Sequence, residues 1–252
     1  MQEHPYFQND RVVVLAHRGS ATPTENTIEA FKVALEGGAD YLETDIRTTK
    51  DQVAVLFHDE TICRLTGSDQ RISDLTWSQL KRFKLSGGGT ITSLSDALTA
   101  LPQAKFNLDL KDKQSVHAAV KIIEEQKAQA RVLVSSFSNR RRKEALKLFS
   151  SPVATSGSAT TVLVLWLLVS LRMPQSMVNS RLRGIGALQI PRKLSVIKLD
   201  SKRFIHSILA SGTQIHYWTI NSPEEMLELT RLGASGIVTD VPELAVRTLR
   251  KA

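Results

Sequence analysis

Short apolar runs alternate with amphipathic segments along this chain. Residues 11–16 are rich in valine and too few for a stable helix, so they predict a strand. Residues 27–35 carry apolar side chains at helical spacing and predict a helix that Thr24 or Asn26 could cap. Residues 40–46 then predict a second strand. A strand, a helix and a strand in this order are typical of a parallel α/β protein.

The alternation continues to the end of the chain. Helices are predicted at 116–126 and 143–149, in the apolar segment 162–171, and from Pro223, where Ser222 and Glu225 have the spacing of a capping box. Further strands are predicted at 106–111, 132–137, 153–155, 188–191, 215–219 and 236–240. If the apolar run 53–57 pairs beside the second strand as an extension, eight barrel strands remain. A length of 252 residues fits one α/β barrel as well as two domains.

Four polar residues stand out because they lie inside or directly after apolar runs of strand type. His17 and His58 each follow such a run, and Glu43 and Asp45 lie two apart, so both carboxylates project from one face of their strand. Burying carboxylates at such positions costs free energy unless a cation, a substrate or mutual pairing compensates. A metal site for phosphoryl transfer would compensate all four. In the strand 106–111, Asn107, Asp109 and Lys111 also share a face.

Composition narrows the class of protein. With 42% hydrophobic and 23% charged residues the chain can bury one large core, and no linker rich in Pro, Gly or Ser divides it. The single cysteine, Cys63, excludes an intrachain disulfide and favours a reducing compartment. The net charge of +8 comes with clusters of basic residues. Such clusters either lie on solvated helix faces or attract an anionic membrane or substrate. Nucleic acid is not expected, because the basic clusters are not interleaved with aromatic residues.

Two segments are informative about export and membrane association. Residues 1–10 lack the basic start and apolar core of a signal peptide, so we expect a cytoplasmic protein. The segment 162–171 is too short to span a bilayer. It predicts either a barrel helix that is buried unusually fully, or an apolar lip that receives an acyl chain or gives the protein a peripheral membrane contact.

An ordered set of motifs covers nearly the whole chain. It comprises His17-Arg18-Gly19, Thr24-Glu25-Asn26-Thr27, 38–45 with Thr49-Lys50-Asp51, His58-Asp59 with 64–66, 72–76, Leu108-Asp109-Leu110-Lys111, Ser135-Ser136-Phe137, 217–221 and 236–242. With these motifs the sequence resembles the glycerophosphodiester phosphodiesterase family. The resemblance implies a (β/α)8 TIM barrel with its site at the carboxyl ends of the strands. It also implies a single domain over residues 1–252, with a short insertion at about 59–103 between the second and third barrel strands.

The resemblance also implies a role for each matching residue. Glu43, Asp45 and Asp109 would be ligands of a divalent cation, Mg²⁺ or Ca²⁺, and His17 and His58 would be the acid/base pair. Phosphate and substrate contacts would come from Arg18, Lys111, Phe137 and Trp218, although core packing is the alternative for the two aromatic residues. Independent chemistry agrees, because a phosphodiester needs its charge neutralised and imidazole suits proton transfer near neutral pH.

One position departs from the family pattern. The third carboxylate is usually a glutamate two residues before the lysine, and here it is Asp109, which is one methylene shorter. A bound cation would then be displaced, recruit a water or bind more weakly. Glu25 and Asp112 are candidate substitutes or partners in a second layer around the site, and a buried Asp109 paired with Lys111 is the alternative reading. Asp240 is expected to brace the last strand turn rather than to contact substrate.

Three functions follow. The first is a metal-dependent phosphodiesterase that converts small glycerophosphodiesters to glycerol 3-phosphate and an alcohol. The second is a lysophospholipase D acting on lysophospholipids, which the apolar segment 162–171 favours. The third is a barrel that binds phospholipid or phosphodiester without turnover. Only the aspartate at position 109, in place of the usual glutamate, favours this third function. The sequence offers no protein nucleophile in the motif set, so the first two functions predict attack by a neighbouring substrate hydroxyl and a cyclic phosphate. The oligomeric state cannot be read from this pattern.

Overall fold

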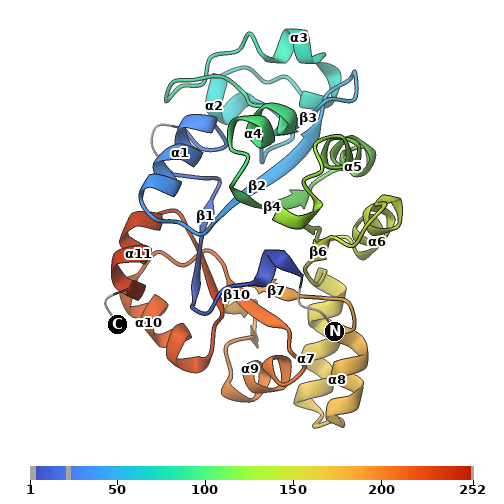
Figure 1. Ribbon diagram of the computed structural model, residues 1–252, viewed down its shortest axis with the longest axis vertical. Coiled ribbons are helices and arrows are strands. Elements are labelled where there is room, and N and C mark those ends of the chain that lie inside the picture. Colours follow the sequence, from blue (N-terminus) through green and yellow to red (C-terminus); the bar gives the residue numbers. More distant parts are fainter. Residues whose placement is uncertain (1–3, 21–23, 251–252) are drawn as a thin grey trace.

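Eight parallel strands form the barrel of this protein, which a computed structural model describes for residues 4–20 and 24–250 (Figure 1). The hydrogen-bonded order is β6-β5-β4-β2-β1-β11-β10-β7, and a parallel bridge between Ser156 and Ala187 joins its two ends. The strands are β1 (Val13–His17), β2 (Tyr41–Thr48), β4 (Lys105–Leu110), β5 (Val132–Ser135), β6 (Ala154–Thr155), β7 (Ala187–Ile190), β10 (Gln214–Tyr217) and β11 (Gly236–Thr239). The predicted TIM barrel is confirmed.

The apolar run 53–57 is the extension that the sequence predicted. Its strand β3 (Ala54–Leu56) pairs antiparallel with the far end of β2 and adds no barrel strand. A second small sheet is the hairpin of β8 (Lys193–Leu194) and β9 (Ile197–Lys198), which follows β7. Both additions lie beyond carboxyl ends of barrel strands, where α/β barrels carry their variable loops.

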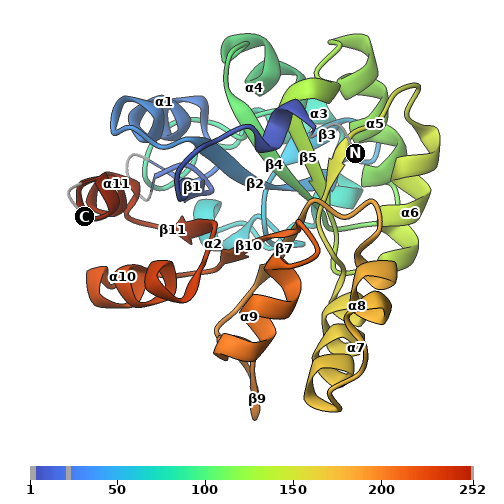
Figure 2. The same cartoon turned by 60° about the horizontal axis from the view of Figure 1, so that its bottom comes forward.

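Helices surround the barrel and cover the outer face of its strands (Figures 1 and 2). They are α1 (Ile28–Glu36), α4 (Leu94–Ala100), α5 (Ser115–Glu125), α6 (Asn139–Leu148), α7 (Ala159–Ser170), α8 (Gln175–Leu182), α9 (Lys202–Leu209), α10 (Pro223–Leu232) and α11 (Pro242–Arg250), with the short α2 (Cys63–Thr66) and α3 (Trp77–Leu80). The main core lies between strands and helices, where β-branched and leucine side chains pack against one apolar stripe of each helix.

Helix starts differ from the sequence predictions in two places. Thr27 caps α1 by accepting a hydrogen bond from the Ala30 N–H, so the prediction of Thr24 or Asn26 as the cap was wrong. The helix predicted at 143–149 starts earlier, because Ser138 caps α6. Ser222 caps α10 as predicted.

The amino-terminal end of the barrel is plugged. The 3₁₀ turn η1 (Pro5–Phe7) inserts Tyr6 and Phe7 into the barrel interior, and the Tyr6 ring stacks on Tyr41 with 4.6 Å between centroids. Because these aromatic side chains fill one end, a ligand can enter the barrel interior from the carboxyl ends of the strands.

Residues 59–103 leave the barrel between β2 and β4. The part that holds α2, η2 (Ile72–Asp74) and α3 has a small apolar cluster of its own, formed by Val55, Phe57, Ile62, Ile72, Leu75, Leu80, Leu85 and Ile91. Helix α4, in contrast, packs Leu94, Ala97 and Leu98 into the main core. The inserted part therefore stands over the barrel as an appendage to β2 and β3.

The apolar segment 162–171 is a helix that is buried on one side. Val162, Leu165 and Val169 of α7 are buried, whereas Leu163 and Leu167 are 44% and 43% exposed and Leu171 is 69% exposed. The expectation of an unusually full burial was therefore wrong, since α7 leaves an apolar stripe in solvent. Across the described part of the chain, every helix is too short or too polar to span a bilayer. Residues 1–3, which belong to the segment considered for a signal peptide, lie outside the described residues.

Candidate active site

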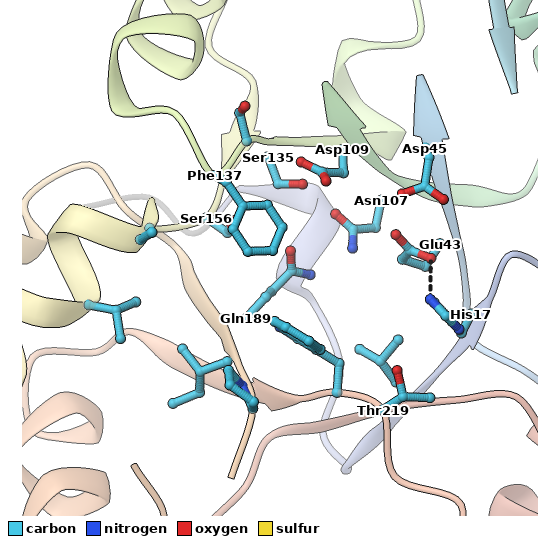
Figure 3. Close-up of a pocket in the computed structure, with 18 of the residues that line it drawn as sticks. His17, Glu43, Asp45, Asn107, Asp109, Ser135, Phe137, Ser156, Gln189 and Thr219 are labelled. Atoms are coloured by element: carbon cyan, nitrogen blue, oxygen red, sulfur yellow. Dashed lines mark ion pairs between the residues drawn. The ribbon is translucent and has the colours of Figure 1, made fainter. Parts of the chain in front are cut away.

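Two layers of polar side chains inside the barrel build the site. In the first layer the register aligns His17 of β1 with Glu43 of β2 and Asn107 of β4. Two residues further along, Asp45 of β2 aligns with Asp109 of β4, and Asp109 aligns with Ser135 of β5. Because side chains two apart on a strand point to the same side, both layers face the barrel interior (Figure 3).

A sharp turn after β1 brings Arg18 over these layers. Arg18 and Gly19 both have positive φ, of 55° and 89°. A side chain at Gly19 would meet the Phe31 ring at 2.7 Å, so glycine is required for this close approach. The Arg18 N–H donates to Glu43, and the Asn26 N–H donates to the Arg18 carbonyl at 2.8 Å. The turn is therefore fixed to β2 and to the loop before α1.

His17 is held between two carboxylates. Its Nδ1 lies 2.6 Å from Asp240 Oδ1, and its Nε2 lies 3.9 Å from Glu43 Oε2. Burial lowers the pKa of His17, but the hydrogen bond to Asp240 and the charge of Glu43 outweigh it, so the net pKa is raised. The Asn221 side chain donates to the other oxygen of Asp240. Asp240 thus orients the His17 ring with its Nε2 toward Glu43.

His58 has a corresponding support on the other side of the site. Its Nδ1 lies 2.8 Å from Asp59 Oδ1, and Arg64 donates to the second oxygen of Asp59 at 2.6 Å. Arg64 also binds Glu25 at 2.6 Å, and Glu25 accepts from Arg18 at 3.1 Å. This chain of ion pairs joins the His58 and Arg18 loops. Both histidines therefore use Nδ1 for an aspartate and keep Nε2 for other partners.

The three candidate metal ligands lie close to two cationic side chains. The Lys111 ammonium is 2.8 Å from Asp45 Oδ1 and 2.7 Å from Asp109 Oδ2, and Arg18 Nε is 3.2 Å from Asp45 Oδ2. Among the described residues this Asp45 oxygen has no hydrogen-bond partner of good geometry. Within the same residues, no group of three or more His, Cys, Asp or Glu side chains is already arranged to hold a metal ion.

Two of the candidate metal ligands have raised pKa values. Burial, reinforced by the charge of Asp45, raises the pKa of Glu43 to about 7. Burial also raises the pKa of Asp109, although Lys111 acts in the opposite direction. The sequence-predicted pairing of Asp109 with Lys111 is present, and Asp109 at the same time faces the cavity. Three buried carboxyl groups therefore share the site with two cationic side chains, Lys111 and Arg18, and burial favours the neutral forms of Glu43 and Asp109.

A cavity of about 350 Å³ connects these groups. Its polar half is lined by His17, Arg18, Glu43, Asp45, His58, Asn107, Asp109 and Lys111. Its apolar half is lined by Phe137, Val162, Ile190, Pro191, Leu194, Leu199 and Trp218. The rings of Phe137 and Trp218 meet edge to face at 6.1 Å, and the Lys111 ammonium lies 5.6 Å from the Phe137 ring. All nine sequence-predicted site residues therefore line one cavity.

The residues that support the two histidines were not predicted from the sequence. Asp240 braces the strand turn as predicted, through Asn221, but its pairing with His17 was not predicted, and neither was a role for Asp59 or Arg64. The available signal was position: Asp240 ends a predicted strand, and Asp59 follows closely after one. Glu25 forms an ion pair with Arg18, so it acts as a partner of a site residue rather than as a substitute metal ligand. Asp112 lies elsewhere, because it accepts from Thr48 and from the Ser115 N–H at the start of α5.

Comparisons with known proteins agree with this geometry. The model of the "Glycerophosphoryl diester phosphodiesterase family" matches residues 17–244. The "Probable glycerophosphodiester phosphodiesterase 2" of Mycobacterium tuberculosis is 34% identical over 92% of this chain and 88% of its own length. The human "Lysophospholipase D GDPD1" is 28% identical over 90% of this chain and 83% of its own. A solved glycerophosphodiester phosphodiesterase of Thermotoga maritima superposes with a TM-score of 0.74, at 28% identity over 95% of this chain and 99% of that one. The chain belongs to the glycerophosphoryl diester phosphodiesterase family, whose members are phosphoric diester hydrolases.

Proposed function

We propose that this protein hydrolyses glycerophosphodiesters to glycerol 3-phosphate and an alcohol, using histidine acid/base catalysis and a divalent cation. One observation carries the proposal. A single cavity joins two aspartate-supported imidazoles to three buried carboxylates and to the cationic side chains of Arg18 and Lys111. Relatives named glycerophosphodiester phosphodiesterase support the same activity.

The donor set fits a hard cation such as Mg²⁺ or Ca²⁺. Glu43, Asp45 and Asp109 would hold it, since carboxylate oxygens are the ligands these ions prefer. Burial disfavours the charged form of Glu43, and one Asp45 oxygen has no hydrogen-bond partner of good geometry among the described residues; such an ion would compensate both. When bound, the cation would supply a positive charge for the oxygens of the phosphodiester. Because Lys111 bridges Asp45 and Asp109, its ammonium would adjust as the ion enters.

His17 and His58 divide the proton transfers. Each has its Nδ1 bound to an aspartate, so each ring is oriented to take up or release a proton at Nε2. In the proposed first step a substrate hydroxyl next to the phosphodiester attacks phosphorus, loses its proton to one imidazole, and expels the alcohol, which the other imidazole protonates. Arg18 and Lys111 bind the non-bridging phosphate oxygens. Water then opens the resulting cyclic phosphate to glycerol 3-phosphate.

A lysophospholipid is the second candidate substrate. The apolar half of the cavity offers Phe137, Trp218 and Leu194 to a hydrocarbon chain, beyond what a small glycerophosphodiester needs. Phe137 is 58% exposed and Val162 of α7 lines the same wall, so the apolar surface continues from the cavity to the outside. A relative named lysophospholipase D supports this candidate.

Phosphorus NMR of the products distinguishes the alternatives. The protein is incubated with glycerophosphocholine or with lysophosphatidylcholine, and Mg²⁺ and Ca²⁺ are added separately. Formation of glycerol 3-phosphate from glycerophosphocholine supports the main proposal, and lysophosphatidic acid from the second substrate supports lysophospholipase D. Absence of turnover of both substrates with either metal would leave a barrel that binds phospholipid without catalysis.

A further inference from the structure

The β8–β9 hairpin carries an apolar tip that nothing in the described structure covers. Val196 lies in its two-residue turn and is 93% exposed, the highest value among the exposed large hydrophobic residues. Leu194, on the adjoining strand, is 50% exposed. Leaving an extended apolar tip in water is unfavourable, so it points to a partner that buries it.

The hairpin stands at the mouth of the active-site cavity. It follows the carboxyl end of β7, and Leu194 lines the cavity wall as well as the outer surface. In Figure 2 the β9 end of the hairpin projects beyond α9, from the same edge of the barrel as the helix pair α7 and α8. The exposed stripe of Leu163 and Leu167 belongs to that pair. Leu194 of the hairpin and Val162 of α7 both line the cavity, so the two elements that carry exposed apolar residues both reach the entrance.

Positive charge lies on the strands of the hairpin and at the start of the helix that follows it. Lys193 and Lys198 pair across the hairpin, and Lys202 and Arg203 follow at the start of α9. Within the described part of the chain, none of these four side chains has an acidic partner within ion-pair distance. Arg192 differs, since its charge is taken up by Asp200, Glu225 and Glu228. The hairpin therefore presents an apolar tip with unpaired cations on its strands and at the start of α9, which matches the acyl and headgroup zones of an anionic bilayer.

We infer that the β8–β9 hairpin docks the protein on anionic phospholipid membranes, with Val196 inserted below the headgroups and Lys193 and Lys198 at their level. The inference rests on the proposed function in one respect: docking places the cavity mouth, through Leu194, against the surface from which an amphiphilic phosphodiester would enter. Membrane binding itself needs no turnover, so it is measured independently of the reaction.

Vesicle flotation of the full-length protein tests the inference. Vesicles of phosphatidylcholine alone are compared with vesicles in which part of it is replaced by phosphatidylglycerol. The wild type is expected to bind the anionic vesicles more strongly. Val196→Asp should weaken that binding about tenfold, because it removes an inserted side chain and adds a repelled charge. The double variant Lys193→Glu, Lys198→Glu should abolish the preference for phosphatidylglycerol.

Val33→Asp is the matched control, since Val33 is an exposed valine on α1, and it should bind vesicles as the wild type does. Equal vesicle binding by Val196→Asp and Val33→Asp would overturn the inference, as would a wild type that ignores phosphatidylglycerol. A change in size-exclusion profile of Val196→Asp without vesicle binding by the wild type would also overturn it, in favour of a contact between two copies. Turnover of soluble glycerophosphocholine should be unchanged in Val196→Asp, which verifies its fold. If the wild type lacks that turnover but binds vesicles, the proposed function fails and the docking surface stands.

Discussion

The Nδ1 atom of His17 lies 2.6 Å from a carboxylate oxygen of Asp240, although 223 residues separate the two in the sequence. The contact exists because β1 and β11 are neighbours in the closed barrel, with Ala16 in register with Thr239. It fixes the tautomer of His17 and leaves Nε2 facing Glu43.

Replacing Asp240 should therefore change the titration of His17. In Asp240→Asn the hydrogen bond from Nδ1 meets a neutral acceptor, so the pKa of His17, which Asp240 helps to raise, should decrease. Proton NMR of the histidine ring follows this directly, and kcat should fall about tenfold to a hundredfold. An unchanged His17 titration in the variant would exclude Asp240 as its orienting partner.

Removing either imidazole should abolish most turnover. His17→Ala and His58→Ala are each expected to lower kcat by about a hundredfold to ten-thousandfold, which is the usual contribution of general acid/base catalysis. His117→Ala is the control, because His117 is an exposed residue of α5 away from the cavity. Thermal unfolding should remain near that of the wild type for all three. A variant of His17 or His58 that keeps more than half the rate would remove that residue from the mechanism.

Chelation should inactivate the enzyme reversibly, because the three buried carboxyl groups of the site outnumber the two cationic side chains beside them, and a bound cation would favour their charged forms. Added Mg²⁺ or Ca²⁺ should also raise the unfolding temperature, since an ion at a hundred times its Kd stabilises the folded state by about 2.7 kcal/mol. Glu43→Gln should reduce both effects.

Asp109→Glu tests whether Asp109 is the third metal ligand, as we propose. Lengthening the side chain by one methylene should alter the affinity or preference for the metal, as measured by isothermal titration. Full activity in excess chelator would contradict the metal proposal as a whole. An unchanged titration of Asp109→Glu would contradict the part assigned to Asp109.

A substrate that lacks the hydroxyl next to the phosphodiester should react more than about a hundredfold more slowly, because a neighbouring hydroxyl attacks with a high effective molarity. The comparison uses glycerophosphocholine and its 2-deoxy analogue, with phosphorus NMR to detect a cyclic phosphate from the parent compound. Cleavage of the analogue at the normal rate would favour direct attack by water.

Acid should destabilise the fold through His216, which is completely buried in β10. Burial lowers the pKa of His216 to about 4, whereas the unfolded chain titrates near the ordinary value of 6.5. Between these two values the unfolded state binds a proton that the folded state does not. Lowering the pH from 7 to 4.5 should therefore cost about 2 kcal/mol of unfolding free energy through this residue.

Urea unfolding of the wild type and of His216→Gln at both pH values measures this contribution. The variant should lose less stability on acidification than the wild type does. His117→Gln, at an exposed position, should show the wild-type loss. Identical losses in the wild type and His216→Gln would show that His216 titrates in the folded state as it does in the unfolded chain.

Local patterns in the sequence determined most of the elements. The apolar runs marked seven of the barrel strands at nearly their observed positions, and the two-residue spacing of Glu43 and Asp45 fixed their common face. Strand periodicity carries this information because alternate side chains point to opposite sides of a sheet. The ordered motifs identified the family, and with it nine of the residues that line the cavity. The strand predicted at 153–155 is present but only two residues long.

Contacts between distant segments were decided by the tertiary structure. Nothing local to Asp240 indicates that it binds His17, and nothing local to Arg64 indicates that it joins Asp59 to Glu25, because both depend on which strand ends and loops become neighbours. The exposure of α7 was also undetermined, since a uniformly apolar helix has no periodic face to show which side is buried. The same holds for Val196, whose exposure follows from the projection of its hairpin beyond the barrel. Sequence spacing thus set which side chains share a strand face, and closure of the barrel set which of them meet.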